Sequence, residues 1–228
     1  MKTVLVVVAH ADDEVLGCGG TMAKHSAEGD EVFVVIVSDG VTARYSDLTD
    51  PLAQKELLAR EEAARSAAGI LGVKGIRFLR FPDNRCDSVA MLDIVKSIEA
   101  ACQELKPQII YTHHGNDLNI DHRIVSQSVL TACRPMRDQS VKAIYGVEVL
   151  SSTEWEPDRI GLSFKPNRYV DVSNSMEAKL SAISAYGMEM GEFPHPRSVE
   201  IVKAKSMVRG SEAGVAAAEA FAVIREIV

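Results

Sequence analysis

The sequence lacks the features that mark nucleic-acid-binding or disulfide-rich proteins. Its 228 residues include 25 Lys and Arg against 32 Asp and Glu, a net charge of −7. The basic face that non-specific nucleic-acid binding requires is therefore not expected. The cysteines contain no C-x-x-C pair, which argues against a zinc ribbon or a thioredoxin motif and favours buried, reduced thiols. They are Cys18, Cys86, Cys102 and Cys133.

Long apolar stretches are also lacking. No stretch approaches the roughly 20 apolar residues that a membrane-spanning helix needs. The apolar run after Thr3 is too short for a signal peptide, and His and Asp follow it where a small-residue cleavage site would stand. We therefore expect no membrane span and a cytoplasmic protein. The length and the 46% hydrophobic content predict one globular domain over residues 1–228.

The sequence does have a regular alternation of strand and helix patterns. Buried strands are predicted for 3–9, 31–37, 76–81, 109–112 and 143–150, with helices between them at 15–28, 52–71, 88–105 and 121–133. With right-handed crossovers, this order predicts a Rossmann-like, mostly parallel sheet with helices on both faces. A strand at 167–172, a helix at 175–186 and an interrupted helical tail at 199–228 predict a C-terminal α+β cover. Ser88 and Asn174 are the expected caps of two of these helices.

Two of the predicted strands end in polar clusters. The first strand leads into Ala9–Glu14, which reads A-H-A-D-D-E, and the fourth leads into His113–His122, which reads H-H-G-N-D-L-N-I-D-H. Ligand sites in open α/β sheets gather at the carboxyl ends of strands. Imidazole nitrogen and carboxylate oxygen are both zinc ligands. The two clusters therefore predict a His/Asp metal site with a spare carboxylate for hydrolysis.

The spacing within the clusters suggests a division of roles. His10 and Asp13 lie three residues apart in a strand-to-helix turn and can face one point, and His122 can join them from the second strand end. Three protein ligands leave one position open for water or substrate, which is typical of a catalytic zinc site. Asp12 could take a proton from water as a general base. Asp121 could accept the outward N–H of a histidine and fix its tautomer.

The glycines that follow the first cluster do not form a dinucleotide-binding fingerprint. That fingerprint needs G-x-G-x-x-G directly after the strand, but carboxylates occupy this place and would repel a pyrophosphate. Close packing of the helix against the sheet explains the glycines better. They are Gly17, Gly19 and Gly20.

The two clusters resemble the motifs of a known family. Ala9–Glu14 is similar to the A-H-P-D-D-E signature of the PIG-L/LmbE-like zinc-dependent de-N-acetylases. Asp117–His122, which reads D-L-N-I-D-H, resembles their second motif, and Phe193–Ser198, which reads F-P-H-P-R-S, resembles their tail segment. The order of strands and helices and the spacing between the motifs also match, so the resemblance covers nearly the whole chain.

The resemblance implies an activity and a ligand set. It implies that Asp12 is the general base and that the substrate is an N-acetylated amino sugar of the N-acetylglucosamine type, or its conjugate, with free amine and acetate as products. It also implies a homo-oligomer, a trimer or a hexamer. The cofactor would be Zn²⁺, with Fe²⁺ as another divalent ion that suits such ligands. The implied ligands are His10, Asp13 and His122.

Two positions depart from the family pattern. Ala11 replaces the proline of the first motif, which removes no ligand. Asn119 stands where many relatives have a histidine; with Asp12 and Asp121 it completes the expected catalytic set. An amide can donate to an oxyanion but cannot supply a proton, so the leaving amine would be protonated by Asp12 or by another histidine. The residues expected to face the substrate are Arg44, His113, His114, His195 and Arg197.

Three alternatives stay open at this stage. The same metal chemistry would serve an amidase or esterase acting on another acylated small molecule. The Rossmann-like order would also suit a nucleotide-binding transferase, although no acidic ribose partner stands out after the second strand. A non-enzymatic metal-binding module would need a closed four-ligand site, whereas the sequence offers three ligands and a base.

Overall fold

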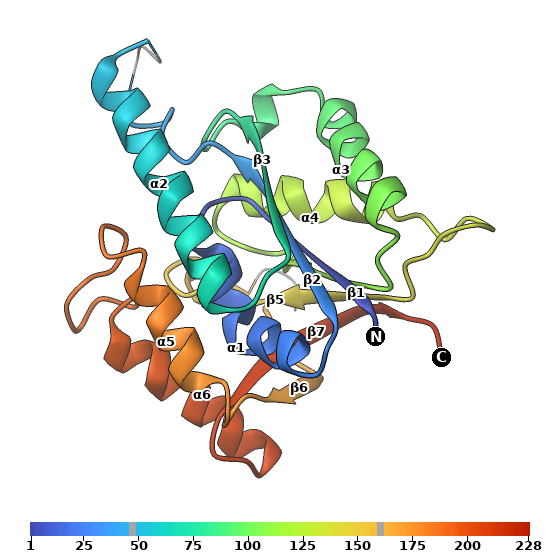
Figure 1. Cartoon of the computed structure of the whole chain (residues 1–228), viewed down its shortest axis with the longest axis vertical. Helices are drawn as coiled ribbons and strands as arrows, with labels where there is room; N and C mark the ends of the chain where they lie inside the picture. Colours follow the sequence, from blue (N-terminus) through green and yellow to red (C-terminus); the bar gives the residue numbers. More distant parts are fainter. Residues whose placement is uncertain (46–48, 159–161) are drawn as a thin grey trace.

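A computed structural model of the chain describes residues 1–45, 49–158 and 162–228 (Figure 1). The strands are β1 (Thr3–Val8), β2 (Glu31–Ser38), β3 (Gly75–Phe81), β4 (Ile109–His113), β5 (Ala143–Val147), β6 (Arg168–Asp171) and β7 (Ala218–Glu226). The helices are α1 (Asp13–Ala27), α2 (Pro51–Ile70), α3 (Met91–Leu105), α4 (Ile120–Ala132), α5 (Met176–Ser184) and α6 (Val199–Ala213). Within the described residues, no helix is both long and apolar enough to cross a lipid bilayer.

The strands form a sheet in the order β3-β2-β1-β4-β5-β7-β6. The first five of these positions are parallel, and β7 runs antiparallel to both of its neighbours. The strand order reverses between β1 and β4, which lie side by side, with Val7 opposite Thr112. This reversal is the switch point at which open α/β sheets bind ligands. The predicted Rossmann-like, mostly parallel sheet is confirmed.

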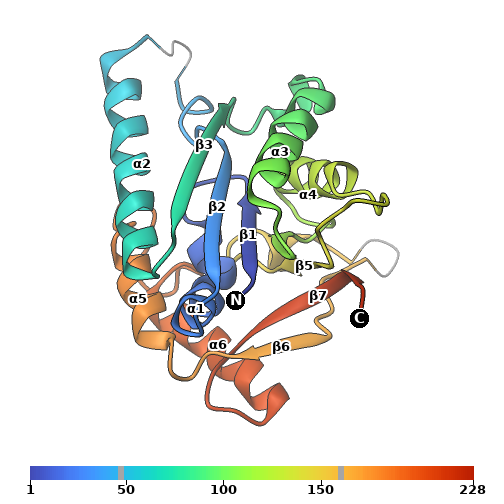
Figure 2. The same ribbon diagram turned by 45° about the vertical axis from the view of Figure 1, so that its right-hand side comes forward.

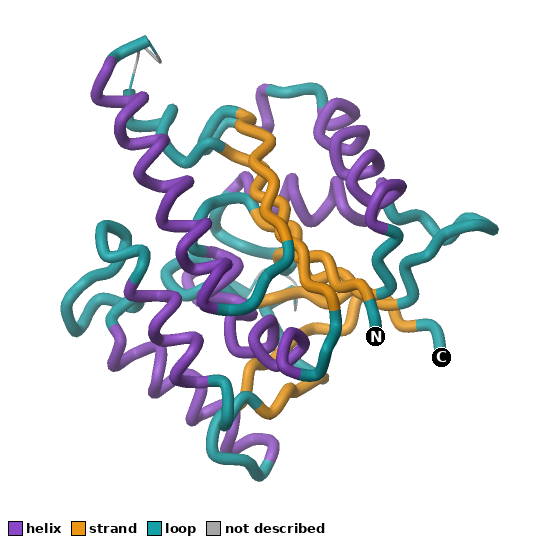
Figure 3. Tube along the Cα trace, in the orientation of Figure 1, coloured by secondary structure: helices purple, strands orange, loops and turns teal. Residues whose placement is uncertain are grey.

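Helices cover both faces of the sheet (Figures 1, 2 and 3). On β1, Val4, Val6 and Val8 pack into a core shared with α1 and α5, whereas Leu5 and Val7 pack into a second core shared with α3 and α4. A strand that is buried on both faces reads as a continuous apolar run rather than an alternating one. This double burial explains the run of Val and Leu at the start of the chain. All four cysteines are buried and free.

The C-terminal tail differs in part from the prediction of an interrupted helical tail over 199–228. The helix α6 ends at Ala213, and Gly214 follows in the left-handed conformation with φ 74°. The next segment is the strand β7, which is inserted between β5 and β6 and pairs Ala222 with Gly146. Alanine favours helices, but pairing with two strands and burial of Ala218–Phe221 override that preference. The predicted cover therefore shares the main sheet instead of lying over it.

Two predicted helix caps are wrong. The hydroxyl of Ser88 donates to the carbonyl of Arg85 (2.7 Å) within a 3-10 turn at Cys86–Ser88, so α3 begins later, after Ala90. A serine that bonds back to a preceding carbonyl holds a local turn and does not cap a helix. The cap position of α5 is Ser175 rather than Asn174.

The glycines of α1 allow the close packing that the sequence predicts. A Cβ atom on Gly17 would lie 2.9 Å from Val147 Cγ2, and one on Gly20 would lie 2.9 Å from Val172 Cβ. Side chains at these positions would push α1 away from the sheet. The position of α1 matters because its first turn carries Asp13.

We expect Gly20→Ala to lower the free energy of unfolding by about 1–3 kcal/mol, the usual cost of overpacking. Gly69→Ala in α2 is the matched control, because nothing lies within 4 Å of its added Cβ. It should be neutral or stabilise by up to about 1 kcal/mol. Urea denaturation of both variants measures the difference. An unchanged stability of Gly20→Ala would show that α1 shifts freely on the sheet.

Candidate active site

The site begins in the short connection between β1 and α1. The strand ends at Val8 and the helix starts at Asp13, so residues 9–12 make the whole turn. Asp12 takes φ 122° and ψ −29°, a backbone conformation that side-chain-bearing residues rarely adopt. The carboxylate of Asp13 accepts the backbone N–H of His10 at 2.8 Å. The turn thus brings the side chains of the first motif to the carboxyl end of β1.

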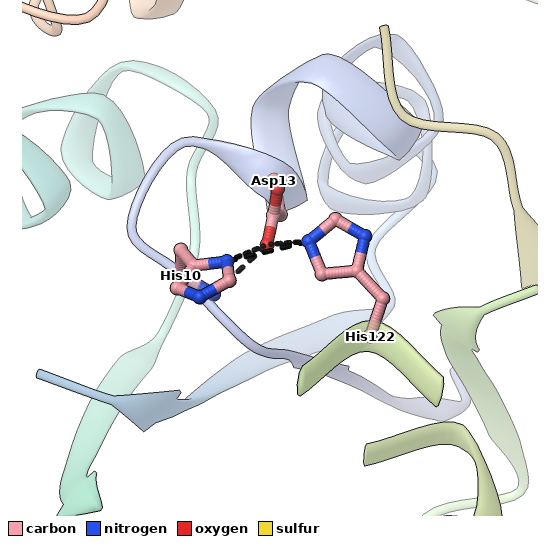
Figure 4. A group of neighbouring side chains, drawn as sticks. All are labelled: His10, Asp13 and His122. Atoms are coloured by element: carbon pink, nitrogen blue, oxygen red, sulfur yellow. Dashed lines mark hydrogen bonds and ion pairs between the residues drawn. The ribbon is translucent and has the colours of Figure 1, made fainter. Parts of the chain in front are cut away.

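Three side chains from the two motifs converge on one point (Figure 4). His10 Nδ1 lies 3.2 Å from Asp13 Oδ2 and 3.3 Å from His122 Nε2, and His122 Nε2 lies 3.2 Å from Asp13 Oδ2. Ligand bonds of 2.0–2.2 Å in a tetrahedral site place the ligand atoms about 3.3–3.6 Å apart. The three atoms are therefore spaced as ligands of one metal ion.

Asp13 carries a second sign of a cation site. Its Oδ1 atom is buried and has no hydrogen-bond partner among the described residues. Buried polar atoms in folded proteins nearly always have a partner, because leaving one unsatisfied is costly. A second carboxylate oxygen without a donor, on the residue whose Oδ2 contacts both imidazoles, fits a site that binds a cation.

Carboxylates hold the outward nitrogens of both imidazoles. His10 Nε2 lies 3.1 Å from Asp83 Oδ1 and 3.3 Å from Asp121 Oδ2. His122 Nδ1 lies 3.1 Å from Asp117 Oδ1. Such contacts fix the tautomer, so that the inward nitrogen carries the lone pair a metal needs.

These charges shift the pKa values of the ligands. Burial acts to lower the pKa of His122, but Asp13 and Asp117 outweigh it and raise the pKa to about 9. Burial also acts to lower the pKa of His10. Hydrogen bonds to Asp121, Asp13 and Asp83 outweigh it and raise this pKa well above its usual value. Burial acts to raise the pKa of Asp13, but His122 and His10 hold it well below the usual range. Without a metal ion both imidazoles therefore carry protons that metal binding must displace.

A second carboxylate, that of Asp12, is paired with Arg197. Arg197 Nη1 lies 2.5 Å from Asp12 Oδ2, and its Nε donates to Ser151 Oγ at 2.7 Å. Burial raises the pKa of Asp12 to about 7, although the guanidinium of Arg197 acts to lower it. A carboxylate with a pKa near neutrality can both accept and return a proton.

A cavity of about 220 Å³ opens beside these groups. Its wall is polar and carries both signs of charge. The residues of its wall that bear polar side chains are His10, Asp12, Arg44, Arg60, Asp83, Asn84, Asn119, Glu189 and Arg197.

Besides Asp12, three of the residues expected at the substrate or in catalysis line this cavity. Arg197 lines it, as described, and Arg44 stands at its wall with half of its side chain exposed and paired with Glu56. Asn119 also lines it. The Asn119 Oδ1 atom accepts the N–H of Asp121 and caps α4, while its Nδ2 donates to Asn84 Oδ1 at 3.2 Å.

The three further histidines expected near the substrate do not line the cavity. His113 is fully buried and its Nε2 accepts the N–H of Ala9 at 2.8 Å. Burial lowers the pKa of His113 to about 3, so its ring is neutral. His114 bonds the backbone of Asn116, and the exposed His195 accepts the N–H of Arg197.

The sequence reasoning missed three residues. Asp83 and Asp117 directly follow the carboxyl ends of β3 and β4, so the same strand-end argument could have found them. Arg60 lies in the middle of α2, where a charged residue usually faces solvent. Only the fold shows that Arg60 is 5% exposed and pairs with Glu189 at the cavity.

The combination of fold and site defines a class of α/β protein, one with a candidate metal site at the switch point of its sheet. Within this class, a family model described as GlcNAc-PI de-N-acetylase matches residues 5–133. The match covers more than half of the chain and includes both motifs, so the chain belongs to this family.

Relatives and a solved structure agree with this assignment. The chain is 28% identical over 191 residues to the uncharacterized deacetylase YaiS of Escherichia coli strain K12, covering 81% of this chain and 90% of that one. It is 29% identical over 206 residues to diacetylchitobiose deacetylase of Thermococcus kodakarensis, covering 84% and 72%. The structure of GalB, the 4-carboxy-2-hydroxymuconate hydratase of Pseudomonas putida, shares the fold with a TM-score of 0.78 and 22% identity, covering 100% and 98%.

We expect metal binding to strengthen as pH rises. The folded-state pKa of His122 is raised from 6.5 to about 9. In the metal-free protein, its contribution to stability is therefore complete below pH 6.5 and is lost as pH rises through about 9. A divalent cation competes with that proton, so the Tm increase caused by saturating Zn²⁺ should grow between pH 6 and 9. Thermal unfolding with and without the ion tests this, and an increase independent of pH would contradict it.

Proposed function

We propose that the protein is a metal-dependent hydrolase that removes the acetyl group from an N-acetylated amino sugar of the N-acetylglucosamine type, or from its conjugate. The products are acetate and the free amine. The convergence of His10, Asp13 and His122 beside the buried carboxylate of Asp12 carries the proposal. The relatives described as deacetylases, one of which is named for diacetylchitobiose, support amide hydrolysis.

We propose Zn²⁺ as the cofactor. His10 Nδ1, Asp13 Oδ2 and His122 Nε2 would hold it, and three protein ligands of this kind suit a catalytic zinc site. Fe²⁺ would suit the same nitrogen and oxygen set. When bound, such a cation polarises a carbonyl oxygen and lowers the pKa of water.

Asp12 is the proton-transfer group in this proposal. Its carboxylate takes a proton from the attacking water, and its pKa of about 7 allows it to give that proton up again. The leaving amine nitrogen must be protonated, because an amide nitrogen is a poor leaving group as an anion. His113, His114 and His195 stand outside the wall of the cavity, so we assign this second transfer to Asp12 as well.

The amide of Asn119 and the carboxylate of Asp121 have supporting roles. Asn119 Nδ2 lies at the cavity wall and can donate to the oxygen that gains charge, in exchange for its bond to Asn84. Asp121 contacts His10 rather than the cavity, so it acts by orienting that imidazole.

The remaining wall suits a hydroxylated ring. Arg60 and Arg44 can donate hydrogen bonds and Asp83 can accept them, which matches sugar hydroxyl groups that do both. The nucleotide-binding alternative is disfavoured because the residues directly after β1 are A-H-A-D-D-E and not a G-x-G-x-x-G fingerprint. An esterase or another amidase would use the same groups, so the choice of acyl compound decides between them. A trimer or hexamer stays a prediction from the resemblance, and a cytoplasmic location stays a prediction from the lack of long apolar stretches in the sequence.

The first test is acetate release from a panel of N-acetylated amino sugars, compared with acetyl esters and unsaturated hydroxy acids. We expect release only from the amides, loss with a chelator and recovery with Zn²⁺, because the metal supplies essential chemistry. Acetate measured enzymatically, with the bound metal assayed in parallel, gives the readout. Turnover of the esters alone would favour the esterase, and water addition to a double bond would favour a hydratase.

The second test concerns Asp12. We expect Asp12→Asn to keep its bound metal and to lower kcat by about 10²–10⁴-fold, the usual contribution of a general acid–base group. Asp87→Asn, at an exposed carboxylate in the 3-10 turn, is the matched control and should keep full activity. Turnover per bound metal ion measures both variants. Wild-type turnover in Asp12→Asn would remove Asp12 from the mechanism.

A further inference from the structure

Glu14 is a buried carboxylate for which the proposed reaction has no use. It completes the A-H-A-D-D-E motif, is 2% exposed and stands outside the wall of the cavity. Both of its oxygens are engaged. Oε2 accepts the backbone N–H of Asp12 at 3.0 Å, and Oε1 accepts the hydroxyl of Tyr186.

The N–H that Glu14 binds belongs to the most unusual backbone position in the site. Asp12 stands before the first turn of α1 with φ 122°. Its N–H therefore lies outside the backbone hydrogen bonds of the helix, and the side chain of Glu14 is its acceptor. A backbone in a sparsely populated conformation persists only when its surroundings hold it there. The bond from the Asp12 N–H to Glu14 is such a restraint, and it lies one residue from the side chain that transfers protons.

Tyr186 in turn fixes Glu14. It follows α5, is 3% exposed, and its hydroxyl is the donor that holds Glu14 Oε1. A short buried chain therefore runs from the Tyr186 hydroxyl through the Glu14 carboxylate to the Asp12 N–H. Arg197 holds the other end of Asp12, its carboxylate. The backbone and the side chain of Asp12 are thus both held by hydrogen bonds.

We propose that Tyr186 is a positioning residue for hydrolysis, one that acts through Glu14 to keep the Asp12 carboxylate aimed at the attacking water. The proposal rests on the function proposed above. It assigns Tyr186 no contact with substrate or metal. It differs from a purely structural role because loss of the hydroxyl would change the rate of the chemical step in molecules that remain folded and metal-loaded.

The variant Tyr186→Phe removes only the hydroxyl. We expect kcat per bound metal to fall about 10- to 100-fold, since small misplacements of a catalytic group cost this much. KM should stay within about two-fold and metal content should not change, because neither ligands nor cavity wall are touched. Tyr145→Phe is the matched control: Tyr145 is also buried and donates to a glutamate, Glu226, at 2.6 Å. It should keep wild-type kcat.

A second pair of variants covers the case in which Tyr186→Phe does not fold. In Glu14→Gln the amide oxygen can still accept the Asp12 N–H and the amide nitrogen can donate to Tyr186, whereas Glu14→Ala loses both bonds. We expect Glu14→Gln to be at least about ten-fold more active than Glu14→Ala. Equal losses in the two variants, or a Tyr186→Phe enzyme that loses Tm but keeps kcat, would overturn the proposal.

Amide hydrogen exchange of Asp12 gives a readout that does not depend on activity. We expect faster exchange of this N–H in Tyr186→Phe than in wild type or Tyr145→Phe, because its acceptor is no longer fixed. Unchanged exchange would refute the positioning role whatever the enzyme does. If the wild-type protein releases no acetate but exchange still accelerates, the proposed function fails while the link between Tyr186 and Asp12 stands.

Discussion

The turn between β1 and α1 is the constraint on which the site depends. Residues 9–12 must convert a strand buried on both faces into a helix packed against the same sheet, and the glycines of α1 allow that approach. The cost is a backbone conformation at Asp12 of the kind that takes of order 1–3 kcal/mol. Two hydrogen bonds from backbone N–H groups to side chains, His10 N–H to Asp13 and Asp12 N–H to Glu14, offset part of it, since a hydrogen bond contributes roughly 0.5–1.5 kcal/mol to stability.

Negative charge is concentrated around this turn by buried carboxylates from several parts of the chain. Asp13, Asp83, Asp117 and Asp121 surround His10 and His122, all within the buried switch point between β1 and β4. Buried carboxylates are costly without positive partners, so the site demands either protonated imidazoles or a cation. The outer carboxylates that orient the rings also raise the pKa values of His10 and His122. Protons and metal therefore compete for one pair of nitrogen atoms, and occupancy by either one satisfies the buried charge.

The sequence predicts the centre of this arrangement because local and topological rules agree there. A short continuous apolar run that ends in polar residues is typical of a doubly buried strand, and ligand sites gather at the carboxyl ends of such strands. Two such runs placed His10, Asp13 and His122 together. The same rule applies to Asp117, which follows the buried strand β4. It applies less well to Asp83, because the edge strand β3 that precedes it contains Arg77 and Arg80 and is only partly buried. The strand β7 was not predicted, because its alanines favour a helix in isolation. Only its pairing with β5 and β6 makes this segment a strand. Arg60 and Tyr186 could not be found, since their partners come from distant parts of the chain that pack together only in the folded protein.

The site has two parts that come from different regions of the chain. The candidate metal ligands and the carboxylates that contact them all lie within residues 5–133, the part that matches the family model. The groups that hold Asp12, namely Arg197 with Ser151 and Tyr186 through Glu14, come largely from residues after 133. The fold is shared by a hydratase, so sheet and switch point alone do not dictate which bond is attacked. Proton transfer depends on where the Asp12 carboxylate points. Changes in the C-terminal contacts that hold Asp12 could therefore adapt the same candidate metal site to different reactions. In this chain the C-terminal contacts hold the carboxylate of Asp12, whose pKa is about 7, beside the candidate ligands. A carboxyl group with such a pKa suits the proton transfers of amide hydrolysis.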